Sequence, residues 1–121
     1  MIKTLVTGAL GRMGRETLKA VHNSKTLELC AAVDINPTTQ TLGQIIGAEL
    51  ALPMHTELSK ALEAAKPRVV VDFTRPDVVM TNLRLVLSKG IFAVVGTTGF
   101  SEADLQELDQ LAKANDTAVL I

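Results

Sequence analysis

The feature that most constrains this chain is the regular alternation of short apolar runs with segments of helical periodicity along its 121 residues. Apolar runs predict strands at residues 2–6, 27–33, 52–55, 68–73, 91–95 and 117–121. Helical patterns fall between them, at residues 12–23, 42–46, 57–66 and 74–89 and from Ser101 onward. Since a helix that joins two parallel strands makes a right-handed crossover, we expect a doubly wound α/β fold, a parallel sheet between two helical layers.

Local signals sharpen several of these elements. Three consecutive valines, Val69 to Val71, predict a strand that is buried on both faces. Thr56 is expected to cap the helix that follows it, and Thr74-Arg75-Pro76-Asp77 and Ser101-Glu102-Ala103-Asp104 are typical of helix starts. The last helix is expected to bury one apolar stripe, made of Leu105, Leu108, Leu111 and Ala112.

A glycine turn follows the first predicted strand directly and opens the first predicted helix. It is Val6-Thr7-Gly8-Ala9-Leu10-Gly11-Arg12-Met13-Gly14, with the spacing G-x-x-G-x-x-G. In a dinucleotide-binding fold, small residues at this place allow a tight turn, close approach of backbone N–H groups to a pyrophosphate, and packing of the helix on the strand. The helix N-terminus adds unpaired N–H donors and a partial positive charge. The turn therefore predicts a Rossmann-like cofactor site.

Asp34 ends the second predicted strand, 20 residues after the last glycine of the turn. A carboxylate at this place suits the ribose hydroxyls of the adenosine half of a dinucleotide, or else it caps the turn at Asn36-Pro37. Ile35 and Asn36 provide no cation for a 2′-phosphate, so NADH is expected to be usable. Arg12, Thr38 and Thr39 are still able to contact a phosphate, and the choice between NADH and NADPH stays open on the sequence alone.

Two further loops follow predicted strands, at the edge where ligands bind in open α/β sheets. They are Val71-Asp72-Phe73-Thr74-Arg75-Pro76 and Val95-Gly96-Thr97-Thr98-Gly99-Phe100. The glycines of the second loop permit a flat ring to approach the backbone. Thr97 and Thr98 supply hydroxyl and N–H donors to a ligand, or serve only the chemistry of the turn.

Composition excludes several classes of function. There are 12 Lys and Arg against 13 Asp and Glu, scattered and without runs, so no nucleic-acid-binding face is expected. The single cysteine, Cys30, forms no internal disulfide and is expected to be a buried apolar residue in a cytoplasmic protein. The absence of tyrosine excludes the Tyr–Lys pair of short-chain dehydrogenases, and no P-loop is present. No membrane segment and no metal site are predicted.

Three motifs together make the chain resemble the dihydrodipicolinate reductases. They are Val-Thr-Gly-Ala-Leu-Gly-Arg-Met-Gly-Arg at 6–15, Val-Asp-Phe-Thr-Arg-Pro at 71–76 and Val-Gly-Thr-Thr-Gly-Phe at 95–100. The resemblance implies hydride transfer from NADH or NADPH to a cyclic dicarboxylate in lysine (diaminopimelate) biosynthesis. It also implies cofactor contacts from Gly8, Ala9, Leu10, Gly11, Arg12, Met13, Asp34, Phe73, Arg75, Gly96, Thr97 and Thr98.

The resemblance also implies parts that this chain lacks. Members of the family are about twice as long, and their second domain carries a His-His pair with a lysine, a substrate-binding Gly-Thr pair and the tetramer interface. His22 and His55 stand apart, in a helix and a loop, so no catalytic residue is predicted here. Residues 1–121 are therefore expected to be a dinucleotide-binding domain that binds cofactor without turnover. The alternative is a free-standing regulatory module that binds a dinucleotide.

Overall fold

A six-stranded parallel sheet with the order β3-β2-β1-β4-β5-β6 forms the centre of the computed structural model, which describes residues 1–121. The strands are β1 (Ile2–Thr7), β2 (Leu27–Val33), β3 (Met54–His55), β4 (Val69–Asp72), β5 (Phe92–Val95) and β6 (Val119–Leu120). The helices are α1 (Arg12–His22), α2 (Leu42–Ile46), α3 (Leu58–Ala65), α4 (Pro76–Ser88) and α5 (Glu102–Ala114). The predicted doubly wound α/β fold is confirmed.

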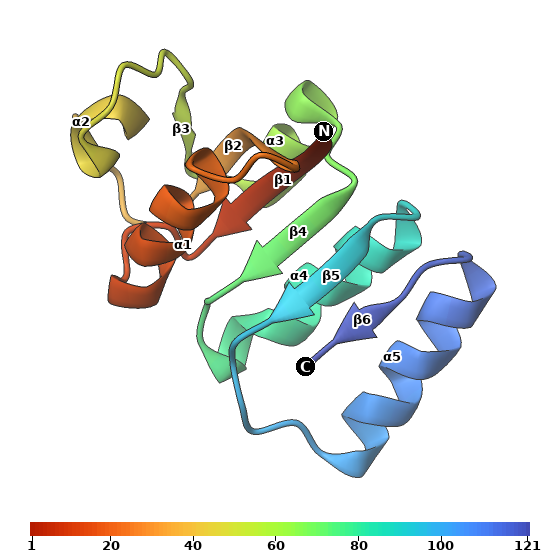
Figure 1. The fold of residues 1–121 in the computed structure, drawn as a ribbon. Coiled ribbons are helices and arrows are strands. Elements are labelled where there is room, and N and C mark those ends of the chain that lie inside the picture. The colour runs from red at the N-terminus through yellow and green to blue at the C-terminus, as the bar shows by residue number, and fades with distance from the viewer.

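Helices cover the two faces of the sheet unequally. Figure 1 shows α1 and α2 on one face, beside β1 to β3, and α3 and α4 on the opposite face. α5 packs against α4 and β6. The strand order reverses between β1 and β4, so the chain after β3 crosses to the other face of the sheet. None of the five helices combines the length and the apolar character that are needed to span a membrane.

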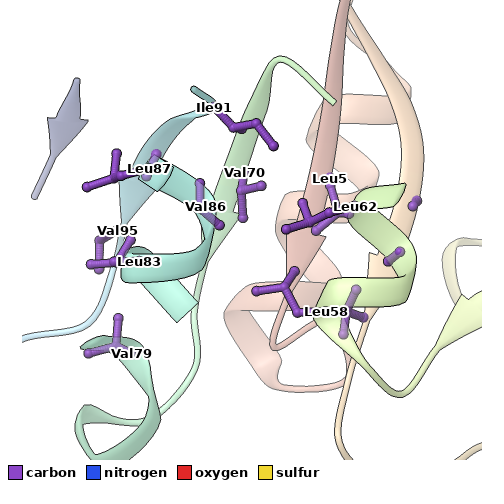
Figure 2. Packing of buried hydrophobic residues seen from close by; sticks show 14 of the residues in the cluster. Leu5, Leu58, Leu62, Val70, Val79, Leu83, Val86, Leu87, Ile91 and Val95 are labelled. Atoms are coloured by element: carbon purple, nitrogen blue, oxygen red, sulfur yellow. The ribbon is translucent and has the colours of Figure 1, made fainter. Parts of the chain in front are cut away.

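Two apolar clusters hold these layers together. The larger one joins α3, α4 and α5 to the sheet, and Figure 2 shows Val86 of α4 beside Val70 of β4. The smaller cluster joins α1 and α2 to the other face, around Leu18 and six further buried residues. The helical spacing of the apolar residues places them on one side of each helix, which is why each helix buries only that side.

Where no helix covers the sheet, the predicted burial is wrong. Val70 is fully buried, but its neighbours Val69 and Val71 are only half-buried. Along the same face, Phe92, Val94 and Leu120 are exposed. Successive strand residues point to opposite faces, so three valines in a row are buried on both sides only when both sides are covered.

Two predicted helix starts and part of one apolar stripe are also corrected. Glu57, not Thr56, precedes α3, and it makes no side-chain cap. Arg75 precedes α4 without a cap, because the Thr74 hydroxyl donates to Asp72 instead. On α5 the predicted Ser101 capping box is present and Leu108 is buried, but Leu105 is 45% exposed. The first and last predicted strands also differ from the observed bounds by a residue or more, since strand ends depend on neighbouring strands.

The strand register prepares the functional edge of the sheet. Thr7 of β1 is paired with Val33 of β2 and with Asp72 of β4, and Asp72 is paired with Val95 of β5. The next residue of each strand is therefore Gly8, Asp34, Phe73 or Gly96. Parallel pairing thus brings four of the residues predicted from the sequence to adjacent positions at one edge.

Candidate functional site

The turn after β1 is held closely against the loop after β4. Gly8 has a φ of +76°, and a Cβ atom on it would lie 2.7 Å from the carbonyl carbon of Phe73. A Cβ on Gly14 would lie 2.0 Å from the Gly8 carbonyl oxygen, so this glycine allows α1 to pack against the turn. Two of the three predicted reasons for glycine, a tight turn and helix packing, therefore correspond to contacts in the structure.

Asp34 fastens the glycine turn to the end of β2. Its side chain is 7% exposed, and its Oδ2 accepts a hydrogen bond from the Leu10 N–H at 2.8 Å. Its Oδ1 accepts from the Asn36 N–H at 2.9 Å. Asp34 therefore caps the turn at Asn36-Pro37 and also lines the cavity described below, where a ribose would bind, so both interpretations of this residue have support. A carboxylate has about four acceptor positions, so two remain for a ligand.

The start of α1 presents backbone donors beyond this turn. The first helical hydrogen bond runs from the Arg15 N–H to the Gly11 carbonyl at 2.9 Å. The N–H groups of Arg12, Met13 and Gly14 therefore precede it, and Gly11 provides no side-chain cap. Arg15 also donates from Nε to the Leu10 carbonyl at 2.9 Å and braces the turn. Uncapped amides at a helix start are suited to an anion.

Phe73 connects the loop after β4 to the loop after β5. A Cβ on Gly96 would lie 2.1 Å from Cε1 of the Phe73 ring, so the ring rests directly on the Gly96 backbone. Thr97 is buried, and its hydroxyl donates to the Thr74 carbonyl at 2.5 Å. This bond corresponds to the turn reading of Thr97. Thr98 and Gly99 are exposed beside it.

A cavity of about 520 Å³ lies between the glycine turn, the end of β2 and the start of α4. It falls within the usual size of a small-molecule site. Ligands in open α/β sheets bind outside the carboxyl ends of the strands, where the strand order reverses, and this cavity lies at that point, between β1 and β4.

The structure gathers half of the predicted cofactor residues around this cavity. Those lining it are Gly8, Leu10, Gly11, Asp34, Phe73 and Arg75. The others are placed elsewhere along the same edge: Arg12 and Met13 are exposed at the start of α1, and Gly96, Thr97 and Thr98 follow β5. Ala9 is fully buried and its N–H donates to the Val33 carbonyl, so it holds the glycine turn against the end of β2.

Sequence reasoning missed several residues of the cavity wall. Thr56 and Leu58 come from the segment after β3, and Val78, Thr81 and Asn82 come from α4. Two signals in the sequence could have found them. Thr56 follows a strand of the same sheet, and the spacing 78, 81, 82 puts three side chains on one face of a helix.

Neither the histidines nor the cysteine are among the residues that line this cavity. His22 ends α1 and His55 ends β3, and both are half-buried. Cys30 is half-buried in β2, and burial raises the pKa of its thiol above the usual value, which disfavours the reactive thiolate. No three His, Cys, Asp or Glu side chains come together as metal ligands.

The strand order, the glycine turn that opens α1 and the acidic residue that follows β2 define a domain of the Rossmann class. The family model described as "Dihydrodipicolinate reductase, N-terminus" matches residues 2–121. The chain therefore belongs to this family, which confirms the resemblance drawn from the three motifs.

Proteins of similar sequence agree with this assignment. The 4-hydroxy-tetrahydrodipicolinate reductase of Syntrophomonas wolfei subsp. wolfei is 43% identical over 120 residues, which cover 98% of this chain and 45% of that protein. The reductase of Listeria welshimeri is 40% identical over 121 residues, covering 99% of this chain and 46% of that protein. The chain thus spans less than half the length of these relatives.

Solved structures share the fold. Dipicolinate-bound dihydrodipicolinate reductase from Paenisporosarcina sp. TG-14 superposes with a TM-score of 0.81 at 31% identity, over 98% of this chain and 46% of that chain. The WlbA (WbpB) dehydrogenase from Thermus thermophilus, in complex with NAD and UDP-GlcNAcA, has a TM-score of 0.81 at 16% identity and covers 98% of this chain and 40% of that one. This second likeness shows the common fold alone.

Proposed function

We propose that this chain is the nicotinamide-dinucleotide-binding part of a 4-hydroxy-tetrahydrodipicolinate reductase. The observation that carries the proposal is the joint placement of Asp34, the glycine turn and the uncapped start of α1 around one cavity at the reversal of strand order. Family membership and the dipicolinate bound to the Paenisporosarcina reductase support the substrate class, a cyclic dicarboxylate.

Each part of the site suits one part of the cofactor. The first-turn N–H groups of α1, from Arg12 and Met13, would hold the pyrophosphate. Asp34 would accept from the adenosine ribose hydroxyls while Leu10 and Asn36 keep its carboxylate in place. A reduced nicotinamide supplies a hydride when it is bound.

The loop after β5 would meet the nicotinamide end. Phe73 and Gly96 close its inner side, and the exposed Thr98 lies at the outer side. Because Thr97 already donates to the Thr74 carbonyl, its hydroxyl holds two loops together, and Gly96 and Thr98 are left as the ligand-facing positions.

The charges near Asp34 favour NADH over NADPH. A 2′-phosphate would approach this carboxylate, and positions 35 to 39 contain no Lys or Arg. Arg75 is the cation that lines the cavity, but its guanidinium pairs with Asp77 at 3.3 Å. We therefore propose that NADH binds at least as tightly as NADPH.

The experiment is a fluorescence titration of the chain with NADH and with NADPH. Asp34→Ala is expected to weaken NADH by roughly tenfold, the cost of removing hydrogen bonds to a charged group, with a smaller loss for NADPH. Asp109→Asn, which removes an exposed carboxylate on α5 that does not line this cavity, serves as the control for the change of net charge. Equal NADH affinity in Asp34→Ala would contradict the ribose role.

A kinetic assay tests whether the chemistry lies within this chain. The cavity is lined by no histidine and no lysine. We therefore assign hydride transfer to the substrate ring to the full-length reductase. We place the tetramer interface in the part of the reductase that this chain does not cover. We expect binding without turnover by residues 1–121. Measurable turnover by this chain would show that the chemistry lies within it.

A further inference from the structure

A buried polar cluster lies beneath the loop that follows β4. Its members are Asp72, Thr74 and Asn82, and none of them is among the predicted cofactor contacts. Asp72 ends β4 and is fully buried, with no exposed surface. A carboxylate buried in this way is costly unless donors surround it. Burial of the Asp72 carboxylate is therefore tolerated only if its hydrogen bonds to Thr74 and Asn82 are kept, and these bonds fix the positions of the three side chains.

Asp72 receives donors on both of its oxygens. Oδ1 accepts from the Thr74 N–H at 2.8 Å and from the Thr74 hydroxyl at 2.5 Å. Oδ2 accepts from the side-chain amide of Asn82 at 3.1 Å. Thr74 is in the loop and Asn82 is in the second turn of α4, so one carboxylate ties strand, loop and helix together.

These bonds determine where the wall of the cavity lies. Thr74 and Asn82 line the cavity themselves, and the two residues that flank Thr74, Phe73 and Arg75, line it as well. The Thr74 carbonyl accepts from Thr97, and the Phe73 ring rests on Gly96. If Thr74 moved, Phe73 would move with it, and the loops after β1 and β5 would lose their contact surface.

We propose that Asp72, acting with Asn82, is a positioning residue of the dinucleotide site. Its carboxylate makes no contact with the cofactor in this role. It holds Thr74, and through Thr74 it keeps Phe73 and Arg75 at the cavity wall. The identity of the ligand rests on the proposed function, but the positioning itself rests on the hydrogen bonds above.

An exchange of the two side chains tests this role. Asp72→Asn keeps the shape of the side chain but replaces one of its two acceptor oxygens by an NH2 group, which is a donor. That NH2 group then faces either the Thr74 donors or the side-chain amide of Asn82. NADH affinity is expected to fall on the order of tenfold, as for a broken hydrogen bond to a charged group. In the double variant Asp72→Asn/Asn82→Asp, the new amide at position 72 can donate to the new carboxylate at position 82. The Thr74 amide is then expected to regain the slow hydrogen exchange of the unchanged chain, since the swap restores the pair, and this readout does not depend on the carboxylate that position 82 now places at the cavity wall.

Thr4, another buried polar residue of the sheet, provides the control for loss of a buried hydrogen bond far from the cavity. Thr4 is also buried in the sheet, but its hydroxyl donates to the Ile2 carbonyl at 3.0 Å, toward the opposite edge. Thr4→Val is expected to lower the free energy of unfolding without changing the NADH dissociation constant of the folded protein. Urea unfolding of every variant identifies conditions in which each is folded, and titrations are made there.

The outcomes separate the two proposals. If folded Asp72→Asn binds NADH as the unchanged chain does, or if the Thr74 amide of the double variant exchanges as fast as in the single one, the positioning role is wrong. If the unchanged chain does not bind NADH, the proposed function fails instead. Should Asp72→Asn not fold, hydrogen exchange of the unchanged chain decides. The Thr74 amide is expected to exchange at least about tenfold more slowly than the Thr98 amide, and equal rates would overturn the proposal.

Discussion

At the scale of single residues, the site depends on a few very close backbone approaches. Gly8 and Gly96 both receive Phe73, one against its peptide group and the other against its ring. Asp34 follows β2 and Asp72 ends β4, at the same edge of the sheet, and both carboxylates accept hydrogen bonds from backbone N–H groups. The two carboxylates therefore hold these loops in place without a bound ligand.

Gly96→Ala is predicted to destabilise the protein by about 1–3 kcal/mol, the usual cost of overpacking. The new methyl group would lie 2.1 Å from the Phe73 ring, which must move away. Gly11→Ala is the matched control, because its Cβ would be 3.5 Å from the Gly8 carbonyl oxygen, an ordinary contact. Urea unfolding measures both variants, and an equal effect would show that crowding at Phe73 does not matter.

At the scale of secondary-structure elements, α4 and α5 are joined by an ion pair as well as by their apolar sides. Arg84 of α4 donates to Glu107 of α5 through Nε at 2.5 Å and Nη2 at 3.0 Å. This hydrogen bond lowers the pKa of the Glu107 carboxyl below its usual 4.5 and raises that of the Arg84 guanidinium. Both side chains are substantially exposed, so the energetic effect is small.

Glu107→Gln is predicted to lower stability slightly at neutral pH and not at strongly acid pH. The folded-state pKa of Glu107 is depressed, so its contribution is present above the unfolded value near 4.5 and is lost as pH falls through the lower folded value. Urea unfolding of both proteins from pH 7 downward measures the difference. A difference that persisted at acid pH, or one unaffected by high salt at pH 7, would argue against the ion pair.

At the scale of the whole molecule, the coverage of the sheet decides which apolar residues form the core. α5 packs at the outermost strand, β6, so part of its apolar stripe extends beyond the sheet. Leu108 is 1% exposed and Leu105 is 45% exposed, although they are one helical turn apart. The exposed valine and phenylalanine side chains of β5 have the same origin, because no helix covers that face.

Leu108→Ala is predicted to cost about 2–5 kcal/mol, as is usual for a buried leucine. Leu105→Ala, the matched substitution on the same helix, is predicted to cost under about 1 kcal/mol, because much of its side chain is already in water. Urea unfolding gives both free energies. Similar values for the two would mean that α5 lies differently on the sheet from the arrangement in Figure 1.

Much of the fold and six of the sixteen residues that line the cavity could be predicted from the sequence. Strand and helix periodicity specified the α/β class, and the turn at Gly8 and the acid at Asp34 were found because each has a local requirement. Thr56 and Asn82 were not found as cavity residues. Thr56 follows a strand and Asn82 lies on one face of a predicted helix, but these local signals do not say which cavity the side chains line, because the cavity is formed with elements far away in the chain.

The sequence by itself determined the order of strands and helices, the glycine turn and the three motifs that carry the family resemblance. These follow from local spacing and backbone preference, which a short segment already contains. Only the tertiary structure decided that Asp72 is buried among donors, that Phe73 lies on Gly96, and that Val69 and Leu105 are partly open to water. Burial and close contact depend on which surfaces meet, and that is settled when distant elements pack together.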